Sequence, residues 1–133
     1  MYLKHLTWRE TEQYLQQKKS IIMPIGSQEQ HGPNGMIGTD IICPVRVAED
    51  LSQETGILIG PSIEVGMAQH HLGFAGSITV RPTTLISIIE DYVKILAKHG
   101  FTHFFFLNGF QFLRGFMPLS LFTSALSFFR YFK

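Results

Sequence analysis

The sequence predicts an α/β fold in which helices cover both faces of a mostly parallel sheet, giving three layers. Three short apolar segments, residues 20–25, 57–60 and 101–107, alternate with longer segments whose apolar residues have helical spacing. Such alternation is typical of βαβ units with parallel strands. At 133 residues, 45% hydrophobic and 16% charged, the chain is long enough for one globular domain with a core.

The first helix and the first strand are predicted from local signals. Thr7 suits the N-cap of a helix that ends near Gln17, and Trp8 is expected to pack within it. Residues 20–25 form a compact apolar run, which indicates a buried strand. This strand leads directly into a glycine-rich loop, so the loop is expected at the strand's carboxyl end.

The second predicted helix covers residues 40–55. Asp40 follows Thr39 and suits an N-cap, Pro44 is tolerated in the first turn, and Gly56 supplies the stop. The expected buried stripe consists of Ile41, Val45, Ala48 and Leu51.

The third predicted helix opens at Pro82 and ends at Gly100, after a short extended segment over residues 77–80. Glu90 and Lys94 are spaced for an ion pair on its surface. Its apolar stripe is Leu85, Ile88, Ile89, Tyr92 and Leu96. Residues 101–107 follow as the last strand.

Charge and cysteine content narrow the classes of partner. The formal net charge is +1 and the basic residues are scattered, so we expect no nucleic-acid partner. Cys43 is the single cysteine, which excludes an internal disulfide and favours a reducing, cytoplasmic location. We expect it to be a small buried residue, with a nucleophilic thiol at a helix start as the alternative. The N-terminus has no apolar stretch of a secretory signal.

The loop after the first strand gathers side chains that bind divalent metals. Glu29 and His31 lie two residues apart, between Gly26 and Gly32, and Asp40 follows where a helix should begin. Carboxylate and imidazole groups suit zinc, manganese or ferrous iron. On residue types alone, such a triplet is more typical of a solvated surface loop, and Asp40 has the alternative role of a helix cap worth about 1 kcal/mol.

Two motifs resemble the creatininase (creatinine amidohydrolase) family. The first consists of Pro24, Gly26, Ser27, Glu29, Gln30, His31, Gly32, Pro33, Gly38, Thr39 and Asp40, and the second of residues 70–78, His-His-Leu-Gly-Phe-Ala-Gly-Ser-Ile. The resemblance covers residues 1–109. It implies a metal-dependent amidohydrolase that uses metal-activated water to cleave a C–N bond in a cyclic or linear amide.

The resemblance also implies the site and its partners. Glu29, His31 and Asp40 would be metal ligands, with Asp40 bridging if two ions are bound. The metal would be zinc, with manganese or iron as alternatives, and the partners a small-molecule amide and further copies in a closed homo-oligomer. The catalytic residue is not identified.

His70 and His71 are expected to serve the substrate. Adjacent residues on an extended segment point to opposite faces, so one of the two is expected to face the site while the other packs or is solvated. His70 and His71 are therefore the two candidates for the substrate-binding position.

The chain departs from the family pattern after residue 109. Phe110 stands where the family has a metal-binding histidine, and residues 110–133 contain seven of the twelve phenylalanines and no acidic residue. We interpret residues 1–109 as the N-terminal half of a truncated domain and residues 110–133 as a divergent tail, produced by a frameshift or early stop. A natural C-terminal helix is the alternative.

Three functional hypotheses follow from this division. The first is an amidohydrolase impaired by truncation, and the second a non-catalytic fragment that associates with itself through an exposed sheet edge and the phenylalanine-rich tail. The third is peripheral membrane attachment through residues 116–132. The apolar run at 116–129 is shorter than the roughly 20 residues that span a bilayer, so we expect no transmembrane segment and no membrane partner.

Overall fold

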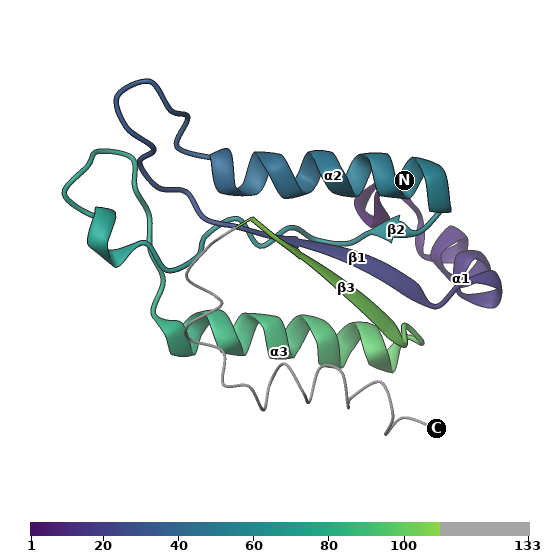
Figure 1. Ribbon diagram of the computed structural model, residues 1–133. Coiled ribbons are helices and arrows are strands. Elements are labelled where there is room, and N and C mark those ends of the chain that lie inside the picture. The colour runs from purple at the N-terminus through teal and green to yellow at the C-terminus, as the bar shows by residue number, and fades with distance from the viewer. Residues whose placement is uncertain (110–133) are drawn as a thin grey trace.

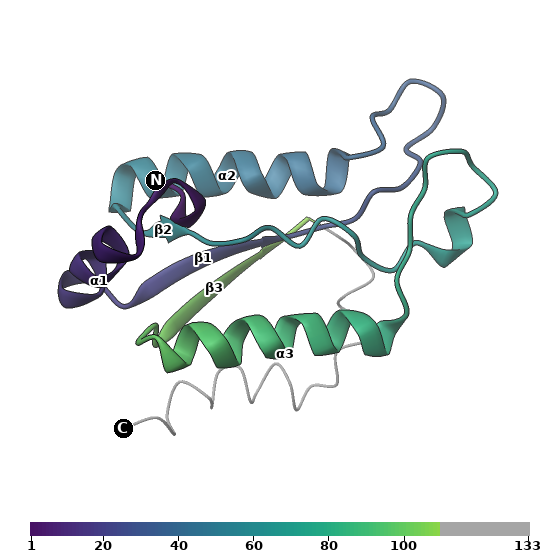
Figure 2. The same ribbon diagram turned by 180° about the vertical axis from the view of Figure 1, so that it is seen from behind.

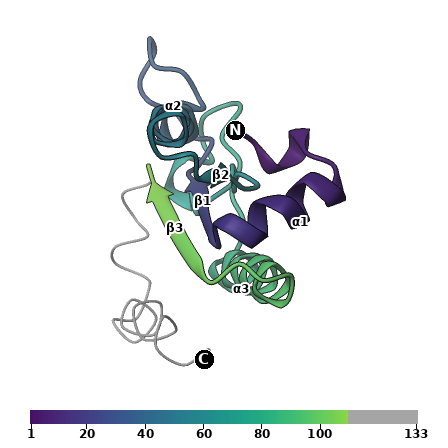
Figure 3. The ribbon, with the colours of Figure 1, turned by 90° about the vertical axis from the view of Figure 1, so that its right-hand side faces the viewer.

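A computed structural model describes residues 1–109, which form three layers (Figure 1). The elements are α1 (Trp8–Gln17), β1 (Ser20–Ile25), α2 (Thr39–Thr55), β2 (Leu58–Ile59), α3 (Pro82–Lys98) and β3 (His103–Asn108), with 3-10 turns at Leu3–His5 and Gln69–His71. Viewed end-on, α2 covers one face of the sheet and α3 the other (Figure 3). This arrangement confirms the predicted layers. The predictions for residues 110–133 lie outside the described part of the chain.

The sheet has the order β2-β1-β3, and β1 pairs in parallel with both neighbours. The parallel sheet is therefore confirmed. Parallel strands end at the same edge of a sheet, so the segments that follow β1, β2 and β3 meet there. Both side views show the loop after β1 beside the segment that precedes α3 (Figures 1 and 2). A backbone hydrogen bond of 2.9 Å from Ile78 to Gln28 joins these two loops.

The core lies on both faces of β1, because side chains alternate along a strand. Ile25 packs with Leu85 of α3, and Ile21 and Met23 pack with Phe101 and neighbouring side chains of α1 and α3. Ile22 points the other way, towards Ala48 of α2. The predicted apolar run of residues 20–25 is thus a strand buried between two layers of helices.

α1 begins with a capping box. Thr7 accepts a hydrogen bond from the backbone of Glu10, and the Glu10 carboxylate accepts one from the backbone of Thr7. The bond from the Thr7 backbone, followed by one that the Thr7 hydroxyl donates to the same carboxylate, lowers the pKa of Glu10. Thr7 as N-cap is therefore confirmed.

Trp8 does not pack as predicted: it is 66% exposed and lies against Arg9, because the helix turns Tyr14 and Leu15 towards the core.

We expect Thr7→Ala to lower the free energy of unfolding by about 1 kcal/mol, since it removes the cap. Chemical denaturation at neutral pH measures this loss. The difference from wild type should shrink as the pH falls through the lowered pKa of Glu10, because protonation weakens the bond from the Thr7 hydroxyl to the Glu10 carboxylate, which only the wild type makes. Gln13→Ala on the same helix is the control and should change stability by no more than about 0.5 kcal/mol. An equal loss in both variants would contradict the capping role.

The span of α2 was predicted almost correctly, but its cap and its buried face were not. The helix begins at Thr39 with Gly38 as N-cap, so Asp40 lies within the first turn. Gly56 ends the helix in the left-handed conformation, with φ of 67°, as predicted. The buried residues of the helix are Ile41, Pro44, Ala48 and Ser52.

The predicted stripe of α2 was displaced because Pro44 and Ser52 were not counted as core residues. Leu51, predicted to be buried, is 37% exposed, and Val45 is only partly buried. Cys43 is exposed, so its predicted burial is also wrong. Ala48 packs against Ile22 and Ile59 of the sheet, and Ser52 is buried with its hydroxyl bonded to the N-terminal amine.

α3 follows its prediction in most respects. Pro82 occupies the first turn, Leu85 is buried, and Lys94 pairs with Glu90 at 3.0 Å. Tyr92, predicted in the apolar stripe, is 36% exposed. The predicted extended segment at residues 77–80 contains only an isolated bridge between Ile78 and Gln28.

The last strand starts later than predicted, at His103, and Phe101 instead fills the core before it. Within residues 1–109, no helix is long and apolar enough to cross a membrane.

Candidate metal centre

The predicted metal ligands lie where the loop after β1 meets the start of α2. Gly26 follows β1 directly, and its amide donates to the carbonyl of Ile63 at 2.9 Å. A Cβ atom on Gly26 would lie 2.3 Å from the carbonyl oxygen of Asp40, and one on Gly109 would lie 2.1 Å from the same oxygen. Glycine at these two positions therefore lets the first turn of α2 contact the ends of β1 and β3.

A buried hydroxyl links two carboxylates at this junction. Ser27 is fully buried, and its Oγ lies 3.0 Å from Oε2 of Glu29 and 2.9 Å from Oδ2 of Asp40. One hydroxyl has one proton, so it donates to only one of these oxygens at a time. One of the two carboxylate oxygens beside Ser27 is therefore always without the proton of this hydroxyl.

His31 completes the group through both of its ring nitrogens. Nδ1 lies 2.9 Å from the backbone carbonyl of Glu29, and Nε2 lies 3.0 Å from Oδ1 of Asp40. A carbonyl oxygen only accepts, so Nδ1 carries a proton and donates it. This bond, supported by the nearby Asp40 carboxylate, raises the pKa of His31. In the neutral ring, the lone pair lies on Nε2 and faces Asp40.

The charge balance of the group favours a cation. Among the described residues, neither Glu29 nor Asp40 pairs with a lysine or arginine, and their ion-pair partners are histidines. Glu29, His31 and Asp40 each offer one ligand atom, and these atoms lie within 4.8 Å of one another. Two carboxylates and one imidazole are a ligand set suited to a divalent metal with an open position. The residues present therefore fit a metal ion.

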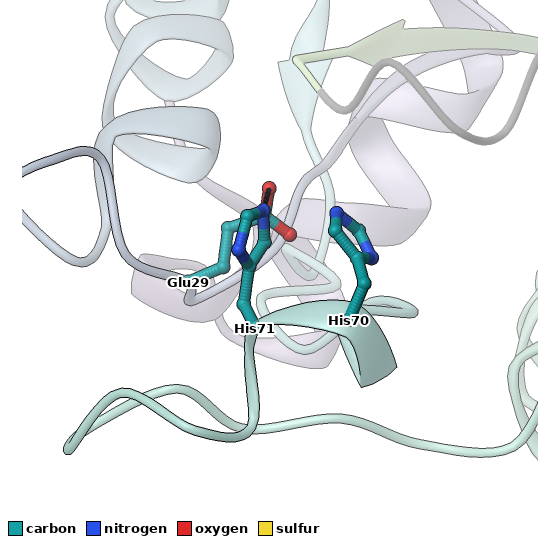
Figure 4. A group of neighbouring side chains, drawn as sticks. All are labelled: Glu29, His70 and His71. Carbon is teal, nitrogen blue, oxygen red and sulfur yellow. Dashed lines mark ion pairs between the residues drawn. The ribbon is translucent and has the colours of Figure 1, made fainter.

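The sequence predicted that His70 and His71 lie on an extended segment, and this prediction is wrong. They belong to the 3-10 turn Gln69–His71, and their ring centroids are 3.9 Å apart. Both side chains extend from the turn towards Glu29 (Figure 4). The prediction that the two side chains point to opposite faces is wrong, because a helical turn, unlike a strand, does not send adjacent side chains to opposite faces.

The two histidines form a second group around Glu29. Nε2 of His71 lies 3.6 Å from Oε1 of Glu29, and ligand atoms of Glu29, His70 and His71 lie within 4.8 Å of one another. Glu29 thus stands between the two groups, with Oε2 towards Ser27 and Oε1 towards His71.

Sequence reasoning assigned no role to Ser27 or Gln30, although both belong to the quoted motif. Gln30 contacts His71 through its side-chain amide at 2.9 Å. The signal that could have singled out Ser27 is its position two residues after a buried strand, where a polar side chain needs a polar partner.

We expect Ser27→Ala to lower the free energy of unfolding of the metal-free protein by about 2 kcal/mol, because it removes the only proton that Ser27 donates to the two converging carboxylates. Urea denaturation in the presence of a chelator measures the loss. Ser87→Ala is the control: its exposed hydroxyl bonds only to the carbonyl of Thr83, so the change should stay within about 0.5 kcal/mol. A Ser27 variant as stable as this control would contradict the role of the hydroxyl.

The geometry agrees with a comparison against known families. A family model described as creatinine amidohydrolase, or Creatininase, matches residues 4–111. The chain belongs to the creatininase family. The resemblance of the two motifs is therefore confirmed, and the matched residues include both groups around Glu29.

Curated creatininase-family relatives include several hydrolases. A 3-dehydro-scyllo-inosose hydrolase of Thermotoga maritima is 31% identical over 110 residues, which are 82% of this chain and 35% of that protein. A creatinine amidohydrolase of Pseudomonas putida is 28% identical over 115 residues, 82% of this chain and 44% of that protein. The chain thus spans less than half the length of these two relatives.

Solved creatininase structures share the fold. One described as creatininase with Mn has a TM-score of 0.81 at 25% identity, and the match covers 98% of this chain and 52% of that one. A creatininase variant complexed with creatine has a TM-score of 0.82 at 25% identity, with the same coverage. These matches confirm the predicted three-layer α/β fold.

Proposed function

We propose that this chain carries the metal-binding part of a creatininase-type amidohydrolase, with Glu29, His31 and Asp40 as ligands of a divalent metal. The observation that carries the proposal is the convergence of two carboxylates on one Ser27 hydroxyl, with His31 as their neighbour and without lysine or arginine partners among the described residues. Zinc and manganese are the proposed metals, because carboxylate and imidazole ligands suit both and a relative is described with Mn.

The proposed reaction is hydrolysis of a C–N bond in a small cyclic or linear amide. A bound divalent ion supplies water whose pKa is lowered to near 7 and a charge that polarises the amide carbonyl. The protein's own residues prepare this chemistry. The Glu29 carbonyl holds His31 with its Nε2 lone pair towards Asp40, and Ser27 holds the two carboxylates together. The His70–His71 turn lies on the Oε1 side of Glu29, and the substrate is proposed to bind beside it.

The experiment that tests the proposal uses the full chain, freed of metal and then loaded with zinc or manganese. We expect a stoichiometric metal by elemental analysis after dialysis. Turnover is assayed with creatinine, by the appearance of creatine, and with a panel of other cyclic and linear amides. A chain that binds metal but cleaves none of them would limit the proposal to metal binding, and a chain that binds no metal would overturn it.

We further propose residues 1–109 as the family domain and residues 110–133 as a separate tail. The end of the sequence match near residue 111 supports this boundary. A cytoplasmic location and a homo-oligomer remain proposals of the same kind. The exposed thiol of Cys43 supports a reducing compartment.

The alternative function is a non-catalytic fragment that associates with itself, and one observation favours it. β3 pairs with β1 on one side only within the described part of the chain, and Phe105 and Phe106 are 47% and 37% exposed. An apolar edge strand is a template for pairing with another chain. Sedimentation velocity over a range of concentrations tests it: a dilution-independent monomer would contradict the alternative.

A further inference from the structure

The side chain of Gln30 holds a fixed orientation between two loops. Its Oε1 accepts a hydrogen bond from the backbone amide of Gly32 at 2.8 Å, and its Nε2 lies 2.9 Å from Nδ1 of His71. The backbone amide of Gln30 donates to Oγ of Ser77 at 3.2 Å. Gln30 thus connects the loop that carries Glu29 with the segment that carries His71.

These contacts determine which ring nitrogen of His71 carries the proton. The Gly32 amide can only donate, so the atom it contacts is the oxygen of the Gln30 side chain. The other amide atom is therefore the NH₂ group, which also only donates. Nδ1 of His71 must accept from it, and in the neutral ring the proton then lies on Nε2. This N–H points towards Oε1 of Glu29, at a distance between nitrogen and oxygen of 3.6 Å.

His31 has the opposite arrangement. Its Nδ1 donates to the Glu29 carbonyl, which leaves the lone pair on Nε2. A histidine that binds metal usually donates its other ring N–H to a carbonyl or carboxylate in this way. His71 faces an amide donor instead, so the nitrogen that it turns towards Glu29 carries a proton. The imidazoles of His31 and His71 therefore differ in chemistry, although both lie within reach of the Glu29 carboxylate.

We propose that Gln30 is a positioning residue that keeps His71 in the Nε2–H tautomer, so that His71 donates a hydrogen bond to an acceptor oxygen of the substrate and does not bind the metal. The 3.6 Å separation from Glu29 is longer than a direct hydrogen bond, so this N–H retains capacity to donate, and the His71 side chain is 20% exposed. The ligand class is a carbonyl or carboxylate oxygen. This inference rests on the proposed metal site at Glu29, His31 and Asp40.

Nitrogen-15 NMR of the histidine rings in the full chain tests the tautomer directly. In metal-free wild type, we expect the Nε2–H form of His71 to exceed the other by about tenfold, together with a coupling across the hydrogen bond between Nε2 of Gln30 and Nδ1 of His71. Imidazole in water already favours Nε2–H, so the decisive sample is Gln30→Glu. A carboxylate only accepts, and it should reverse the preference to Nδ1–H.

Gln69→Glu is the matched control. This substitution adds the same negative charge to the turn that carries His71. The side chain of Gln69 is exposed. We expect the control to leave the His71 tautomer unchanged. If Gln30→Glu leaves His71 in the Nε2–H form, or if the control reverses it equally, the positioning role of Gln30 is overturned.

Addition of zinc separates this inference from the proposed function. We expect the Nε2 resonance of His31 to report ligation while His71 keeps its Nε2 proton. Zinc that removes this proton from His71 would overturn the inference and leave a metal site standing. If no zinc binds, the proposed function fails, and the metal-free spectra of wild type and Gln30→Glu still decide the tautomer.

Discussion

Asp40→Asn is expected to weaken binding of zinc or manganese by about 100-fold, the upper end of the 10- to 100-fold range for loss of an outer-shell partner, because it removes a ligand itself. The amide retains the size of the side chain but removes the charge that faces His31 and the Ser27 hydroxyl. Glu29→Gln and His31→Ala should each have an effect of similar size, because each removes one of three ligands. Metal content after dialysis and titration calorimetry measure these losses.

Asp40→Asn should reduce metal affinity much more than it reduces the free energy of unfolding. Asp40 lies within the first turn of α2 and does not cap it, so Asn loses only a favourable interaction with the helix dipole, worth about 0.5 kcal/mol. In the metal-free protein, removal of one of two converging carboxylate charges offsets this loss. Asp91→Asn on the exposed face of α3 is the control and should bind metal as wild type does. Equal metal content in all variants would eliminate the assigned site.

Gly26→Ala is expected to lower the free energy of unfolding by about 3 kcal/mol, because the added Cβ would lie 2.3 Å from the carbonyl oxygen of Asp40. The neighbouring atoms belong to the backbone of α2, so a side-chain rotation cannot relieve the clash. The start of α2 must move, and Asp40 moves with it. We therefore expect metal affinity to fall together with stability.

Gly73→Ala is the matched control for this substitution. A Cβ on Gly73 meets no atom within 4 Å, so the change should stay within about 1 kcal/mol. Denaturation curves and metal titrations of the two variants, run side by side, measure the difference. Equal stability of Gly26→Ala and Gly73→Ala would show that the first turn of α2 does not pack against the end of β1 as closely as the structure has it.

The helix ends and the strands were largely predictable because their signals are local. Thr7, Pro82 and Gly56 act on backbone groups within a few residues, and each has its predicted role at a helix end. The buried face of α2 was less predictable. Pro44 and Ser52 are buried, and Ser52 bonds to the N-terminal amine 51 residues away, whereas hydrophobicity alone pointed to Leu51.

The sequence by itself determined the order of helices and strands, the family, and the residue types of the candidate metal centre, because each depends on neighbours along the chain. Only the tertiary structure decided how those side chains meet. Ser27 contacts Asp40 from 13 residues away, and Gln30 contacts His71 from 41 residues away. The hydrogen-bond partners of a side chain depend on which segments pack together. These partners distinguish His31 from His71.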